Sequence, residues 1–159
     1  MRYAGRLLTG VVIAALCVST IWLAVVDHAN RNEDASRKNA LAAAVREVPR
    51  VLSYSARSVS QDLARARTLT TGGFRTQFSK LAESTIEPQA IKQGIVTSAT
   101  VTMSGVVRVV TDGEVQVLLF VNQTTTSRAQ PQPRADGSRV LVSMTKVGGQ
   151  WLVSALTPL

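Results

Sequence analysis

The stretch that decides the fold is "IVTSATVTMSGVVRVVTDGEVQVLLFVNQTTTS", residues 95–127. It consists of two runs rich in valine and threonine, which are side chains that strands favour. Asp112-Gly113 separates the two runs, and Asp-Gly is a specific signal for a two-residue hairpin turn. The stretch therefore predicts two antiparallel strands, with a bulge at Gly105.

A second hairpin is predicted at the end of the chain. "SRVLVSMTKV", residues 138–147, meets "QWLVSALTPL", residues 150–159, across Gly148-Gly149. The polar, proline-containing segment between the two hairpins, residues 127–137, is expected to be a loop. Trp151 is expected to pack in the core or at its mouth.

Three helices are expected before the sheet. The first ends at Pro49, the second begins with Ser60 as its N-cap and stops at Gly72-Gly73, and the third ends before Pro88. Their apolar stripes are Leu41, Ala44, Val45 and Val48; Leu63, Ala66 and Leu69; and Phe74, Phe78, Leu81 and Ala82. About three helices followed by about four antiparallel strands predict an α+β domain, in which a strongly curved sheet folds over the helices.

An apolar segment precedes this domain. "LLTGVVIAALCVSTIWLAVV", residues 7–26, contains no charged residue, and as a helix it reaches about 30 Å, the thickness of a bilayer's hydrocarbon core. A cleaved signal peptide fits less well, because the apolar run is too long and Asp27 occupies the −3 position of the nearest small-x-small site. A lipoprotein signal around Cys17 also fails, because Leu16 stands where a small residue belongs. The segment is therefore predicted to be an uncleaved transmembrane helix.

Charge predicts the orientation of this span. Arg2 and Arg6 lie on one side of it, whereas the other side carries acidic and basic residues in equal number, which favours an N-terminus in the cytoplasm. The expected organisation is a cytoplasmic N-terminus of residues 1–6, a transmembrane helix of residues 7–26, a polar stalk of residues 27–38 and an extracytoplasmic domain of residues 39–159.

The formal net charge of +8 suits nucleic acid, an anionic membrane surface or an acidic partner. A domain outside the cytoplasm meets little nucleic acid, so no nucleic-acid partner is expected. The basic helical half is either a solvated face or a docking patch for acidic lipid or protein. Its basic residues are Arg57, Arg65, Arg67, Arg75 and Lys80. The polar tail of the first hairpin, with Asn122, Gln123 and Thr124, is either the end of a sheet or a rim that contacts a partner.

Catalysis is not expected from these residues. The single cysteine, Cys17, and the single histidine, His28, lie outside the predicted domain, so the sequence provides neither a disulfide nor a cysteine or histidine metal site. Among the acidic residues, Asp112, Glu114 and Asp136 fall in turns or loops, Glu83 and Glu87 lie at a helix end, and Asp62, near a helix start, suits the helix dipole. No catalytic residue, metal or cofactor is expected.

Four stretches resemble the Mce-associated membrane proteins of actinobacteria. They are "VLSYS" at residues 51–55, "TTGGFRTQF" at 70–78, "LLFVNQTTTS" at 118–127 and "GSRVLVSMTKVGGQWLVSALTP" at 137–158. The resemblance implies an NTF2-like cone, and an accessory, non-catalytic role beside the Mce systems that import lipids and sterols across the cell envelope. Ser55, Gly149 and Ala155 depart from the family's frequent acidic residues, which puts contacts made through those acids in doubt.

The resemblance implies Mce complex subunits or other envelope membrane proteins as partners. The alternative is a carrier of a small apolar ligand, or a ketosteroid-isomerase-like enzyme, that uses the cone as a pocket. The sequence leaves open which import system and subunit are contacted, and whether the chain self-associates.

Overall fold

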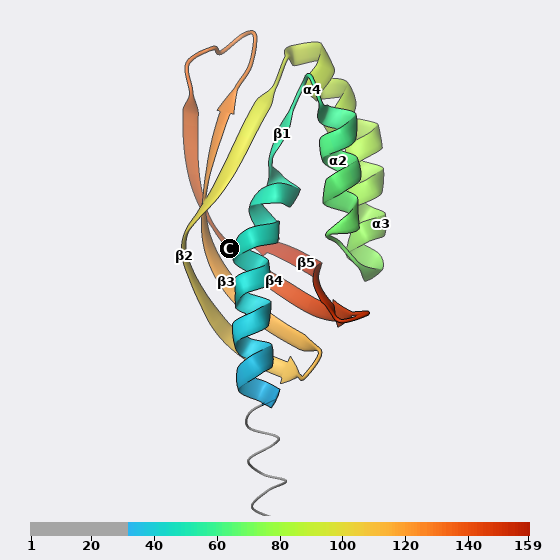
Figure 1. Ribbon diagram of the computed structural model, residues 1–159. Helices are drawn as coiled ribbons and strands as arrows, with labels where there is room; N and C mark the ends of the chain where they lie inside the picture. The colour runs from blue at the N-terminus through green and yellow to red at the C-terminus, as the bar shows by residue number, and fades with distance from the viewer. Residues whose placement is uncertain (1–31) are drawn as a thin grey trace, which may run out of the picture. The chain divides into compact units, whose positions relative to one another are not determined.

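The computed structural model describes residues 32–159, in which three helical segments pack against one five-stranded antiparallel sheet (Figure 1). The helical segments are residues 32–52, α2 (Val59–Thr68), and a third made of α3 (Gly72–Leu81), the π turn η1 (Ala82–Ile86) and α4 (Glu87–Gln93). The strands, in their order across the sheet, are β1 (Tyr54–Ser55), β2 (Val96–Thr111), β3 (Glu114–Thr126), β4 (Arg134–Val147) and β5 (Gln150–Pro158). The expected α+β class is confirmed, and the sheet gains a fifth strand, β1, that the sequence did not predict.

Residues Ser36–Leu159 form one compact unit. The predicted N-terminus, residues 1–6, and the predicted span, residues 7–26, lie outside the described residues. Residues 32–38 of the predicted stalk are helical. Within residues 32–159 no helix has both the length and the apolar character needed to cross a membrane.

Both predicted hairpins are confirmed. Thr111 pairs with Glu114 across Asp112-Gly113, and Val147 pairs with Gln150 across two glycines with φ of 57° and 84°. β4 begins at Arg134, inside the segment that was expected to be a loop, and pairs with β3 as far as Thr125.

The predicted bulge at Gly105 is wrong, because Gly105 pairs regularly with Leu118. The register of β2 against β3 instead shifts three times, leaving Thr102, Val107 and Val110 unpaired. A bulge does not require a left-handed residue, and no residue other than glycine has a positive φ in residues 32–159. These bulges bend β2, so that the sheet curves around the first helix (Figure 1).

The first helix lies on the concave face of the sheet and buries mainly small side chains. Its buried residues are Ser36, Ala40, Ala43, Ala44, Glu47, Val48 and Val51. Val45, predicted to lie in this stripe, is instead exposed at 36%. The helix also continues past Pro49 to residue 52, because a proline removes only one hydrogen bond and the burial of Val51 offsets that loss.

Long-range pairing changes the predicted boundaries of the second helix. Ser58, and not Ser60, precedes α2, and the Ser60 hydroxyl donates to Glu87. The helix ends at Thr68 because the next residues pair with β5: the Val153 N–H donates to the Leu69 carbonyl at 2.9 Å. Gly72-Gly73, predicted to stop α2, begins α3.

The third helical segment does not end before Pro88. At the π turn η1 the Glu87 N–H donates to the Ala82 carbonyl, five residues back. Pro88 follows directly, and because it has no N–H it needs no carbonyl acceptor in the helix. The helix then continues to Gln93 and ends at Gly94, whose φ is 66°. Of the predicted stripe, Phe78 and Ala82 are buried, but Leu81 is 51% exposed.

The core fills the concave side of the sheet. Alternate residues of β3 (Val115, Val117, Leu119 and Val121) are at most 1% exposed and pack in one cluster with the alanines of the first helix. Trp151 belongs to this cluster at 8% exposure, as predicted.

Candidate functional site

The polar tail of β3 divides between the two faces of the sheet. Gln123 Nε2 donates to the Leu52 carbonyl at 3.4 Å, and the Thr125 hydroxyl bonds to that of Thr97 at 2.6 Å. These side chains tie the strand end to the first helix and to β2. Asn122 and Thr124 alternate with them and are exposed, so only these two residues of the predicted rim face solvent on the outer side.

Asn122 borders a shallow hollow on the outer face of the sheet. The hollow is lined by Thr102, Phe120, Val121, Asn122, Gly137, Ser138, Arg139 and Leu159. Asn122 pairs with Gly137 across the ladder, where a Cβ on the glycine would lie 3.4 Å from the Asn122 Oδ1. The glycine therefore keeps this amide accessible.

The predicted arginines on the helical half are each engaged. Arg65 pairs with Asp62, Arg67 Nη2 pairs with Glu83 Oε1 at 2.7 Å, and Arg75 Nε donates to the Arg67 carbonyl at 3.2 Å. The structure thus brings Arg67 and Arg75 together. No hydrogen bond or ion pair within residues 32–159 joins these arginines to the rim of β3.

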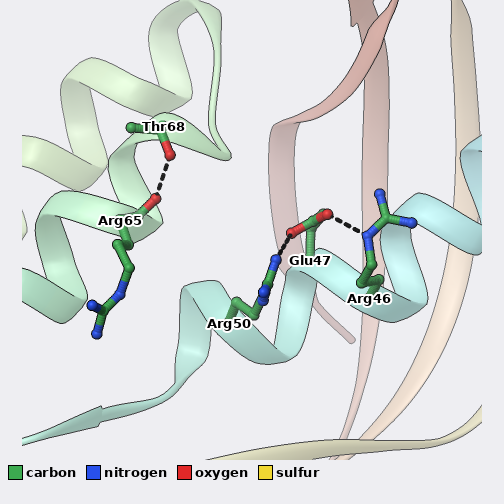
Figure 2. Close-up of polar contacts among 5 residues, drawn as sticks. All are labelled: Arg46, Glu47, Arg50, Arg65 and Thr68. Atoms are coloured by element: carbon green, nitrogen blue, oxygen red, sulfur yellow. Dashed lines mark hydrogen bonds and ion pairs between the residues drawn. The ribbon is translucent and has the colours of Figure 1, made fainter.

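Glu47 is a buried carboxylate that the sequence did not single out. It is 6% exposed and lies between two arginines of its own helix: Arg46 Nε donates to Oε1 at 2.6 Å, and Arg50 Nη1 donates to Oε2 at 3.3 Å (Figure 2). Its spacing of three residues from Ala44 and four from Val51 is the signal that places it on the buried face. Each oxygen of the carboxylate thus accepts a charge-assisted bond from an arginine.

Two hollows flank this ion-pair group. One of about 500 Å³ lies between the first helix, α2 and the β4–β5 turn, and includes Glu47, Leu69 and Trp151 in its lining. The other, of about 350 Å³, is lined by Arg50, Ser53, Asp62, Arg65, Thr68 and Leu69. Figure 2 shows Arg50 between Glu47 and the Arg65 side of α2. Both oxygens of the Glu47 carboxylate thus accept from guanidinium groups, and the residue also lines the larger of the two hollows.

Asp62 holds the start of α2 against β1. Its Oδ2 accepts from the Ser58 hydroxyl at 2.7 Å and from the Ser55 N–H at 3.1 Å, and Arg65 bonds to its other oxygen. Burial alone would raise the pKa of Asp62, but the hydrogen bonds from Ser58, Ser55 and Arg65 outweigh it and the pKa is lowered. Asp62 is therefore an ionised structural acceptor.

A fourth hollow, of about 420 Å³, lies where three segments of the domain meet. It is lined by Ser55, Ala56, Arg57, Gly94, Val96 and Arg128. No carboxylate lines it, and sequence reasoning did not connect Arg57 with Arg128, because the two residues are far apart in the chain. Residues 32–159 contain no group of three or more histidine, cysteine, aspartate or glutamate side chains that could hold a metal ion.

No family model matches the chain. Over 156 residues, which cover 98% of this chain and 96% of the relative, the sequence is 33% identical to the outer membrane protein Rv1973 of Mycobacterium tuberculosis. The chain belongs to the family of that protein. A second relative, the uncharacterized protein Rv1362c of the same organism, is 32% identical to this chain over 142 residues. The match covers 88% of this chain but only 64% of that relative's length.

Several solved structures share the fold, and some of them are proteins of type IV secretion systems. An IcmL-like type IV secretion system protein of Legionella pneumophila matches with a TM-score of 0.63 at 14% identity, over 75% of this chain and 90% of that chain. The periplasmic domain of DotI matches with a TM-score of 0.61 at 16% identity, over 75% of this chain and 91% of that chain. VirB8 of Agrobacterium tumefaciens matches with a TM-score of 0.56 at 16% identity, over 80% of this chain and 92% of that chain. At these identities the likeness shows the fold alone. The domain has an NTF2- and VirB8-like fold, of which the NTF2-like arrangement was implied by the family resemblance.

Proposed function

We propose that this protein is a non-catalytic envelope protein that works by association, as an accessory or stabilising subunit of a larger membrane assembly. Its relative in the family is named an outer membrane protein. The matching folds include the periplasmic domain of DotI and a periplasmic fragment of TraM. We therefore propose an extracytoplasmic domain, residues 39–159, held by a single span at residues 7–26 with a cytoplasmic N-terminus.

The filled concave face of the sheet carries this proposal. In a carrier or an enzyme that uses the cone, the space between helices and sheet holds the ligand. In this chain that space is occupied by Val117, Leu119, Val142 and Met144, none of them accessible to solvent, packed on Ala40 and Ala44. Contacts with other molecules are left to the outer surfaces.

Within this role, we propose that the assembly is an Mce-type lipid or sterol importer. The support is the resemblance of four stretches to the Mce-associated membrane proteins. The specific part of it is "LLFVNQTTT" at residues 118–126 followed by the ending from "GSRV" to "WLVS" at residues 137–154. The partners would be Mce complex subunits or other envelope membrane proteins.

Deletion of the gene tests this proposal. The amount of the importer's subunits in the membrane and the uptake of a labelled sterol or fatty acid should both fall. The full chain should restore both, and the domain secreted without residues 7–26 should restore them poorly, because two contacts on one chain reinforce each other. Unchanged subunit amounts and uptake would contradict the importer role.

A second candidate function is an enzyme or ligand carrier, which the buried carboxylate beside a hollow favours. Glu47 and Trp151 line the same hollow of about 500 Å³. Glu47→Gln keeps the side chain's size and removes its charge. If this variant abolishes uptake while the protein's abundance and its assembly with the importer stay normal, the accessory role is wrong and a catalytic one takes its place.

A further inference from the structure

The hollow formed by Ser55, Ala56, Arg57, Gly94, Val96 and Arg128 is a corner of the domain where charge is uncompensated. Within residues 32–159, neither Arg57 nor Arg128 forms an ion pair, and the neighbouring Lys92 forms none either. Asp62, which bonds to the Ser55 N–H, is already engaged by Arg65. The corner therefore presents two guanidinium groups without an ion-pair partner, which can donate hydrogen bonds to a carboxylate or a phosphate.

The corner is also rigidly built. The Ala56 N–H donates to the Ile95 carbonyl at 2.8 Å, and the Arg128 N–H donates to the Gln93 carbonyl at 2.9 Å. Three segments separated in sequence are thereby fixed against one another, so that little order has to be gained when a partner binds.

Arg128 is held in one position within this frame. Its Nη1 donates to the Lys92 carbonyl at 3.3 Å, at the end of α4. Its side chain lies over Gly94, where a Cβ would come within 2.7 Å of the Arg128 Cγ. The remaining guanidinium donors are available, and their planar arrangement suits a carboxylate or a phosphate.

We propose that this corner, defined by Arg57 and Arg128, binds the carboxylates of an acidic segment of a partner protein. The proposal rests on the proposed function for the choice between protein and lipid. The chain enters the compact unit at Ser36, whose hydroxyl bonds to the Asp112 carbonyl at the β2–β3 turn. The corner lies at the other end of the first helix, which advances about 24 Å over residues 36–52. The corner and the Ser36 end of the first helix therefore lie at opposite ends of the compact unit Ser36–Leu159.

The test is a binding measurement on the purified full chain in a neutral detergent. The probe is a fluorescein-labelled peptide in which glutamate alternates with glycine, and its reference is the same peptide with glutamine in place of glutamate. Fluorescence anisotropy at low salt should detect the glutamate peptide and give no saturable signal with the reference. Replacing both guanidinium groups, in Arg57→Gln with Arg128→Gln, should weaken binding by about tenfold. A factor of ten corresponds to about 1.4 kcal/mol, which is within the range of charge-assisted hydrogen bonds.

A matched control removes the same charge from another face. Arg108→Gln with Lys146→Gln acts on two exposed side chains of the sheet and should change binding less than twofold. All four substituted side chains are exposed, and circular dichroism would establish that each variant keeps its fold. Equal weakening by the two double variants would overturn the proposal, because the interaction would then follow net charge alone.

Dihexanoyl phosphatidylglycerol, which is soluble as a monomer, supplies the lipid arm of the test. If it binds with the same dependence on Arg57 and Arg128 while the glutamate peptide does not, the corner is a headgroup site and the proposal is overturned. The measurement uses purified protein, so a failed peptide test leaves the gene-deletion result unaffected, and a failed importer test leaves the peptide result unaffected.

Discussion

Asp62 connects the start of α2 to the turn that leaves the first helix. Because Ser55 N–H, Ser58 hydroxyl and Arg65 all donate to it, Asp62→Ala should lower the free energy of unfolding by about 1–3 kcal/mol, the cost of leaving a buried donor unpaired. Urea unfolding of the purified protein measures this. Asp136→Ala is the control: its carboxylate pairs only with the exposed Arg134, so the expected change is within about 0.5 kcal/mol.

The lowered pKa of Asp62 adds a dependence on pH. A carboxyl group whose pKa is lower in the folded state contributes its stability above the unfolded value of about 4, and loses it as the pH falls through the folded pKa. The stability difference between the wild type and Asp62→Asn should therefore be constant from pH 5 to 8 and shrink below about pH 4. A difference that grew on acidification would contradict the assignment.

Trp151 is the largest aromatic side chain in the core. At 8% exposure, its replacement in Trp151→Ala should cost about 3–5 kcal/mol of unfolding free energy. Gln150→Ala changes the exposed neighbour at the start of the same strand and should cost less than about 0.5 kcal/mol. A cost under about 1 kcal/mol for Trp151→Ala would place the ring outside the packed core and make it an interface residue instead.

At the scale of elements, the two hairpins differ in what their turns require. Gly149 has a φ of 84°, and no atom lies within 4 Å of the position of an added Cβ. Gly149→Ala should therefore destabilise the protein through backbone strain alone, by about 1–2 kcal/mol. Gly113 has no positive φ, so Gly113→Ala should be neutral or slightly stabilising. Thermal unfolding of the two variants side by side decides this, and an equal loss at both turns would contradict it.

Local signals predicted the elements better than their ends. Both hairpins formed where Asp112-Gly113 and Gly148-Gly149 indicated, although only Gly148 and Gly149 adopt the positive φ that such turns favour. Gly72-Gly73 has a similar local preference, but the pairing of Leu69 with Val153 ended α2 first. β1 has only two residues, and it forms because Val96 and Thr97 pair with it, which no local pattern predicts.

The candidate sites follow the same division. The exposure of Asn122 and Thr124 follows from strand alternation, which the sequence shows directly. The burial of Glu47 depends on which face of a helix meets the sheet, and the sequence stripe that was chosen included the exposed Val45 instead. Arg57 and Arg128 line the same hollow only because the turn before α2, the end of α4 and the loop after β3 lie together in the folded domain. This site could therefore be found only from the tertiary structure.

At the scale of the whole molecule, the compact unit Ser36–Leu159 contains both apolar clusters and all five strands. A fragment of residues 35–159 should therefore fold by itself as a soluble protein. Circular dichroism should show mixed helix and strand content, and urea unfolding should follow one cooperative transition. A fragment that aggregates in mild buffer, or unfolds without a cooperative transition, would show that the core needs the preceding segment.

The three unpaired residues of β2, Thr102, Val107 and Val110, affect whether copies of the chain can pair edge to edge. Beyond Thr97, no strand within residues 32–159 pairs with the outer edge of β2, and Arg108 is the one charge between Ser98 and Val110. A straight edge of this composition could recruit the same edge of a neighbouring copy and grow into a fibre. The bulges at Thr102, Val107 and Val110 interrupt the regular spacing of backbone hydrogen-bonding groups that such growth requires. The bend that wraps the sheet around its helix therefore also protects the protein from polymerisation.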